Sequence, residues 1–198
     1  MPLLGPATAL VLIDVQNDFF HEAGAYPRNG VRCADFEPLP GRLRLVADAV
    51  RENGGFVIST EFTLVPGRDG APFISEGMRK MRPFLGRGDF APGSWGQSPV
   101  AELGPVDMRV EKVAYSAFYM SRLEWVLRRA GIGTLLVGGV VTNGGVASTV
   151  RDAHARDLSV VVLSDGCAAW KKEQHDAALA DLASVATIRS CEEAVTLR

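Results

Sequence analysis

Three features that lie far apart in the chain have residue types that could do chemistry together. Asp14 follows an aliphatic run over residues 8–13, and Lys112 ends a short predicted strand over residues 108–112. A glycine-containing turn at 142–146 follows a further apolar run, over residues 134–141. Because parallel strands place their carboxyl ends at one edge of a sheet, the sequence predicts that the three features meet there. A carboxylate beside an ammonium group could move a proton or orient a water molecule.

The turn at 142–146 is predicted to lead into a helix that Thr142 or Asn143 would cap. Such a turn can bring several backbone N–H groups to the positive end of a helix, where a carbonyl oxygen that becomes anionic could be held. Position 145 lies at the sharpest part of the turn. A nucleophile is expected there, but the sequence has Gly145, which has no side chain.

Strands and helices alternate along the rest of the chain. Amphipathic or small-residue helices are predicted over 39–53, 122–130, 146–157 and 171–184, and further strands over 55–60, 158–163 and 185–189. This order predicts an α/β protein of the Rossmann-like, three-layer type, with a mostly parallel sheet of about six strands and helices on both faces. We expect a single domain over residues 1–198.

The segment at about 61–107 has no clear periodicity and is rich in glycine and proline. A long segment of this kind inside a compact domain is usually a binding loop or lid, and its aromatic residues argue against disorder. A short helix is predicted around residues 75–82. We therefore expect 61–107 to be a substrate loop.

Composition excludes several classes of function. A net charge of −2 gives no electrostatic reason for nucleic-acid binding, and no run is long enough for a membrane helix. The three cysteines form no CxxC pair, and the three histidines are not closely spaced. We expect a cytoplasmic protein without a metal, a cofactor, a membrane partner or a nucleic-acid partner, whose partner is a small-molecule substrate.

Four motifs carry a resemblance to a known family. They are ALVLIDVQNDF at 9–19, VEKVAYSAF at 110–118, GGVVTNGGVASTVRDA at 138–153 and SDGCA at 164–168. In this order they resemble the isochorismatase-like superfamily of cysteine hydrolases, from residue 8 to about 190. The resemblance implies a catalytic aspartate at Asp14, a catalytic lysine at Lys112 and a nucleophilic cysteine at the position of Gly145.

The same resemblance has further implications for the site and for assembly. It implies a cis peptide between Val140 and Val141, an oxyanion hole formed by the backbone N–H groups of Val141 and Gly145, and a homodimer or homotetramer. The nicotinamidases of this family bind a metal through histidines after the second strand. The corresponding stretch here, residues 59–66, contains no histidine.

Glycine at position 145 leaves three interpretations open. The chain could be an amide-, carbamoyl- or ureide-cleaving member whose cysteine has been replaced, so that it is inactive, because the context TNGXVAST resembles the amide-hydrolysing members. It could be a native thiol-free hydrolase, in which a protonated Asp14 donates to the vinyl carbon of an enol ether, although the turn does not match the isochorismatases proper. It could also be a catalytically inactive protein that only binds a small molecule.

Several residues are candidates for substrate binding. Gln16 offers an amide group just after Asp14, and a flat apolar wall could come from Phe19, Phe62, Trp95 and Tyr119. For the aromatic residues, packing beneath the long segment is an equally good interpretation. The ligand that fits these residues is a small planar amide, carbamoyl or ureido compound, with any carboxylate met by an arginine of the segment 61–107.

Overall fold

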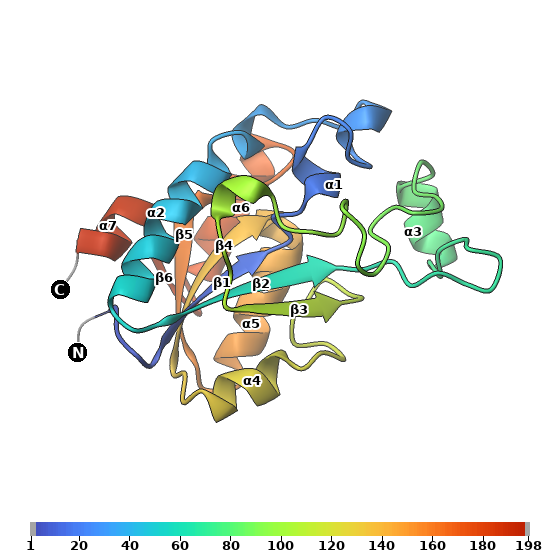
Figure 1. Cartoon of the computed structure of the whole chain (residues 1–198). Helices are drawn as coiled ribbons and strands as arrows, with labels where there is room; N and C mark the ends of the chain where they lie inside the picture. The colour runs from blue at the N-terminus through green and yellow to red at the C-terminus, as the bar shows by residue number, and fades with distance from the viewer. Residues whose placement is uncertain (1–2, 197–198) are drawn as a thin grey trace.

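The computed structural model describes residues 3–196 and contains one sheet of six parallel strands in the order β3-β2-β1-β4-β5-β6 (Figure 1). The strands are β1 (Thr8–Ile13), β2 (Phe56–Phe62), β3 (Met108–Lys112), β4 (Thr134–Val140), β5 (Ser159–Ala168) and β6 (Thr187–Arg189). The four terminal residues of the domain predicted over 1–198 lie outside the described part. The chain first adds β2 and β3 on one side of β1 and then adds β4, β5 and β6 on its other side, so β1 lies in the interior of the sheet.

Helices connect the strands. The α-helices are α1 (Asn17–Phe20), α2 (Leu39–Glu52), α3 (Glu76–Met81), α4 (Leu123–Arg129), α5 (Ala147–His154), α6 (Lys172–Leu182) and α7 (Cys191–Thr196). Short 3-10 turns lie at Pro27–Asn29 (η1), Ala34–Phe36 (η2) and Ala101–Leu103 (η3), and one π-helical turn, η4, spans Thr142–Val146. In Figure 1 the arrow tips of β2 and β3 point to the side of the molecule where α3 lies.

Two helical layers cover the sheet, because successive side chains of each strand point to opposite faces. On β1, Val11 and Ile13 pack with the buried residues of α4, α5 and α6, whereas Leu10 and Leu12 pack with those of α2 and α7. Figure 1 shows α2 and α7 on one side of the sheet and α4 and α5 on the other. The predicted three-layer α/β fold is confirmed.

Two local predictions need correction, and one helix was missed. Neither Thr142 nor Asn143 caps the helix after β4, because the chain first forms the π-helical turn η4, and the Thr142 hydroxyl instead lies 2.8 Å from Nδ1 of His175. The strand predicted to end at 163 continues to Ala168, and Cys167 pairs with Gly139 inside the sheet. The terminal helix α7 was not predicted from the sequence.

Gly139 allows β4 to end in close contact with β1. Its φ is 120°, and a Cβ atom on it would lie 2.1 Å from the backbone oxygen of Ile13. No other residue fits such an approach, since the clash is with backbone and the φ value is unfavourable for L side chains. The turn after β4 is therefore held directly beside the residue that follows β1, which is Asp14.

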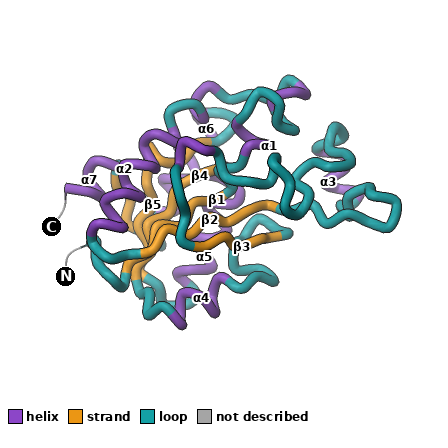
Figure 2. Tube along the Cα trace, viewed as in Figure 1, coloured by secondary structure: helices purple, strands orange, loops and turns teal. Residues whose placement is uncertain are grey.

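Most of the segment between β2 and β3 is loop, with the short helix α3 where one was predicted (Figure 2). It folds onto a satellite apolar cluster that contains Tyr26, Phe62 and Phe90. Asp18, which is buried, fixes the two sides of this cluster: its carboxylate accepts from the backbone N–H of Ala25 at 2.8 Å and from that of Phe90 at 2.6 Å. The segment is thus fastened to the loop after β1.

We expect Asp18→Ala to lower the free energy of unfolding by about 3 kcal/mol, because two buried backbone N–H groups lose a charged acceptor. Urea unfolding would measure the change. Asp69→Ala is the matched control, since exposed Asp69 accepts from Ala71 in the same segment at 3.1 Å and should change stability by less than about 0.5 kcal/mol. Equal unfolding midpoints for the two variants would contradict the role given to Asp18.

Candidate active site

Asp14 and Lys112 form a buried ion pair at the carboxyl edge of the sheet. The Nζ atom of Lys112 lies 2.7 Å from Oδ2 of Asp14, and the two residues are only 2% and 5% exposed. Asp14 has a left-handed backbone with φ of 55°, which is uncommon outside glycine and occurs often at functional sites. The pair arises because β1 and β3 both end at this edge, on either side of β2.

Each side chain of the ion pair also forms a hydrogen bond with a backbone group. Oδ1 of Asp14 accepts from the N–H of Phe62 at 3.1 Å, and Lys112 donates to the carbonyl oxygen of Ala114 at 2.9 Å. Burial raises the pKa of Asp14 from 3.8 to about 6, although the charge and hydrogen bond of Lys112 act in the opposite direction. A carboxyl with this pKa is ionised at neutral pH and can still return a proton, as general acid–base catalysis requires.

Residue 145 lies directly beside the pair. A Cβ atom built on Gly145 would lie 3.3 Å from Oδ2 of Asp14, 3.3 Å from the oxygen of Val140 and 3.0 Å from Cγ2 of Ile13. Gly145 is not among the glycines with positive φ, so its backbone does not require glycine. A side chain at 145 would be directed at the carboxylate after a shift of a few tenths of an ångström by the Ile13 methyl group.

The turn that carries Gly145 is fixed from two sides. Thr149 of α5 donates to the carbonyl oxygen of Gly145 at 2.7 Å and accepts from the N–H of Ala117 at 3.0 Å. These bonds tie η4 to the loop that follows Lys112. The peptide between Val140 and Val141 is cis, as the resemblance implied.

A cavity of about 170 Å³ opens onto these groups. It is lined by Asp14, Phe19, Tyr26, Phe62, Met78, Arg82, Lys112, Ala114, Tyr115, Val140, Val141, Gly145 and Trp170. All three predicted catalytic positions, the predicted oxyanion-hole residue Val141, and the predicted wall residues Phe19 and Phe62 therefore share one cavity.

The other three predicted substrate-binding residues do not line it. Gln16 is fully buried, and its amide is taken up by backbone: Nε2 donates to the carbonyl oxygens of Phe62 at 3.0 Å and Gln97 at 2.8 Å, and Oε1 accepts from the N–H of Phe62 at 2.8 Å. Trp95 is 51% exposed and packs against His21, and Tyr119 is 55% exposed. The structure places these three residues elsewhere: Gln16 joins loops, and the two aromatic rings lie at the surface.

The cavity residues that the sequence did not single out include Tyr115, Trp170, Arg82 and Met78. Tyr115 follows β3 and Trp170 follows β5, so their place after parallel strands was a usable signal. Tyr26 stacks on Trp170 with ring centres 5.1 Å apart and planes at 7°, which gives the cavity a flat wall. Arg82, at the end of α3, had no such signal beyond its place in the long segment, and the same holds for Met78.

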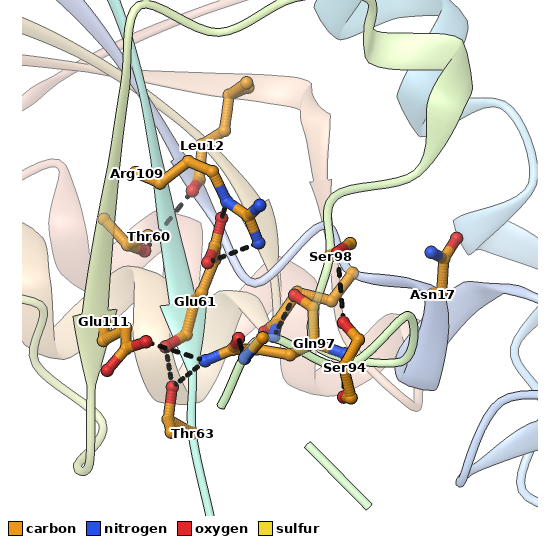
Figure 3. Close-up of polar contacts among 12 residues, drawn as sticks. Leu12, Asn17, Thr60, Glu61, Thr63, Ser94, Gln97, Ser98, Arg109 and Glu111 are labelled. Atoms are coloured by element: carbon orange, nitrogen blue, oxygen red, sulfur yellow. Dashed lines mark hydrogen bonds and ion pairs between the residues drawn. The ribbon is translucent and has the colours of Figure 1, made fainter. Parts of the chain in front are cut away.

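A second, wider cleft of about 560 Å³ lies beside β2 and β3. Figure 3 shows polar side chains of this region, among them Glu61, Gln97, Arg109 and Glu111. Its polar groups bind one another: buried Glu61 accepts from Arg109 at 2.5 and 2.9 Å, and Gln97 donates to Thr63 at 2.6 Å and to Glu111 at 3.4 Å. Burial raises the pKa of Glu61 above its ordinary value, although the hydrogen bond from Arg109 acts in the opposite direction. These mutual contacts make the cleft a poorer candidate for catalysis than the cavity at Asp14.

Residues 3–196 contain no cluster of three or more His, Cys, Asp or Glu side chains placed to hold a metal ion. Within the same residues, no helix has the length and apolar character needed to cross a membrane.

The fold and the buried acid–amine pair beside a helix-initiating turn define a hydrolase site, and the comparisons with known proteins agree. The family described as the isochorismatase domain matches residues 8–193, and the chain belongs to this family. The resemblance found in the sequence is confirmed.

Three relatives illustrate the range of the family. The uncharacterized isochorismatase family protein YecD of Escherichia coli O157:H7 is 32% identical over 198 residues, covering 98% of this chain and 97% of YecD. The ureidoacrylate amidohydrolase RutB of Methylobacterium radiotolerans is 33% identical, covering 90% and 74%. The crystal structure of N-carbamoylsarcosine amidase from Thermoplasma acidophilum superposes with a TM-score of 0.73 at 25% identity, covering 94% and 97%.

Proposed function

We propose that the chain carries the site of an amidohydrolase for a small amide, carbamoyl or ureido compound, and that glycine at position 145 disables the covalent step. The observation that carries this proposal is the direction of residue 145, whose Cβ would lie 3.3 Å from the carboxylate that Lys112 holds. That is the placement a nucleophile needs beside its general base. Two of the relatives, a ureidoacrylate amidohydrolase and an N-carbamoylsarcosine amidase, support a C–N bond as the target.

With a thiol at position 145, each group has a defined part. The carboxylate of Asp14 takes the thiol proton, Lys112 stabilises the thiolate, and the sulfur attacks the carbonyl carbon. The backbone N–H groups of Val141 and residue 145 hold the oxyanion, and Asp14 returns the proton to the departing ammonia or amine. Water then cleaves the acyl-enzyme, a thioester for an amide or a thiocarbamate for a carbamoyl or ureido compound, and the thiol is released. Without the sulfur this route is closed, so the chain retains binding but loses covalent catalysis.

Release of ammonia from a panel of small amides and ureides, measured for this chain and for Gly145→Cys, tests the proposal. Activity in the cysteine variant alone supports an amidohydrolase site that lacks its nucleophile. Activity of the unchanged chain would overturn the idea that glycine disables it. Silence of both chains, with binding retained, would favour a protein that only binds its ligand.

The raised pKa of Asp14 favours a second candidate function, the thiol-free hydrolysis of an enol ether. A carboxyl with a pKa of about 6 is partly protonated in mildly acidic solution and can donate to the vinyl carbon, after which water adds to the oxocarbenium ion. This activity would belong to the glycine chain and would rise as the pH falls through 6. It would disappear in Asp14→Asn.

Three further proposals concern the whole chain. We propose that residues 1–198 form a single domain in which 61–107 is the substrate loop, since this segment supplies Phe62, Met78 and Arg82 to the cavity. We propose a cytoplasmic location, because Cys33, Cys167 and Cys191 are free thiols.

We also propose a homodimer or homotetramer. The support is a set of exposed apolar side chains: Val113, Tyr115, Tyr119, Met120 and Trp125. Sedimentation analysis would test the assembly.

A further inference from the structure

Arg82 is a cation on the wall of the cavity. Among residues 3–196 it forms no ion pair with a carboxylate. Its Nε donates to the hydroxyl oxygen of Tyr26 at 2.5 Å, and its Nη1 lies 3.5 Å from the sulfur of Met78. The guanidinium is therefore held in place by neutral groups, which leave its charge uncompensated.

The balance of charge around the cavity points to an anionic ligand. The lining residues include one carboxylate, Asp14, against two cations, Lys112 and Arg82. Lys112 is already engaged by Asp14 and by the oxygen of Ala114. Arg82, which is half-buried, is left to attract a negative group, and a guanidinium matches the two oxygens of a carboxylate.

The size and shape of the cavity restrict that ligand. Its volume of about 170 Å³ is below the range of pockets for drug-sized molecules, about 300–1,000 Å³. The stacked rings of Tyr26 and Trp170 form a flat wall, and Phe19 and Phe62 also line the cavity. A short planar molecule fits these surroundings better than a bulky one.

We propose that Arg82 is a specificity-determining residue that binds a carboxylate of the substrate. The ligand is then a small planar monoanion, with its amide or ureido group at Asp14 and its carboxylate at the end of α3. The position of the amide group rests on the proposed function. The binding of the carboxylate by Arg82 does not, because it follows from the charge of the cavity.

Calorimetric binding to the unchanged glycine chain tests this inference without any need for turnover. The probes are two matched pairs, fumaric acid monoamide with fumaramide, and N-carbamoylglycine with N-carbamoylglycinamide. In each pair only the carboxylate is replaced by a neutral carboxamide. We expect at least one carboxylate to bind roughly tenfold to a hundredfold more tightly than its neutral partner, as for hydrogen bonds to charged groups.

The same titrations are repeated on three variants. Arg82→Gln should lose the preference for the carboxylate and keep the affinity for the neutral probe. Arg82→Lys should retain part of the preference, and Arg79→Gln, an exposed arginine on the same helix, should leave it unchanged. Thermal unfolding would check that each variant is folded.

Three outcomes would overturn the inference: no preference in either pair, a preference that survives Arg82→Gln, or no binding of any probe at millimolar concentration. Failure of the proposed function is a separate result, because it would appear as an inactive Gly145→Cys variant whose carboxylate preference still depends on Arg82.

Discussion

Replacing Gly145 by cysteine is expected to raise the rate of ammonia release from a small carboxylated amide or ureide by roughly a thousandfold or more. The reason is geometric, because the new Cβ would lie 3.3 Å from Oδ2 of Asp14 and the thiol would be within reach of its base. The rest of the site, including Lys112 and the turn at 142–146, is already in place. The gain would be measured as kcat/KM with a coupled ammonia assay.

Gly145→Ala is the matched control, since it meets the same contacts at Ile13, Asp14 and Val140 without adding a nucleophile. It should remain as inactive as the unchanged chain. Mass spectrometry should show that iodoacetamide labels the cysteine variant at position 145 and that substrate protects it. An inactive cysteine variant that is folded and is labelled at that position would count against the amidohydrolase proposal.

Removing the carboxyl group in the activated protein should have a comparably large effect. In the Gly145→Cys background, Asp14→Asn is expected to lower kcat/KM by roughly a thousandfold, because the amide cannot accept the thiol proton. Asp48→Asn is the control, since Asp48 is a partly exposed carboxylate on α2 that does not line the cavity. Retention of most of the activity by the Asp14 variant would exclude Asp14 as the base.

The pH dependence of the cysteine variant follows from the same group. Burial raises the pKa of Asp14 to about 6, so the carboxyl is ionised above this pH and protonated below it. Only the ionised form can accept a proton, and kcat/KM should therefore fall as the pH drops through about 6. The activity of a thiol-free enol ether hydrolase should instead rise as the pH drops through about 6, since it needs the protonated form of Asp14. A profile that is flat between about pH 5 and 7 would contradict both mechanisms.

The sequence by itself determined the class of fold and the grouping of three candidate site residues at one edge of the sheet. Short continuous aliphatic runs such as 8–13 and 134–141 are typical of strands buried on both faces, and helices between such strands favour parallel connections. Parallel strands end at one edge, which is why the sequence alone groups Asp14, Lys112 and the turn at 142–146. The backbone alone brings these features together.

Tertiary structure decided the lining of the cavity. Gln16 had a suitable amide next to Asp14, but its hydrogen bonds go to the backbone of β2 and of the long segment. Arg82 reaches the cavity from α3, because the segment between β2 and β3 folds back onto the loop after β1 through Asp18. The partner of a polar side chain depends on contacts between residues far apart in the chain, and local periodicity carries no information about those contacts.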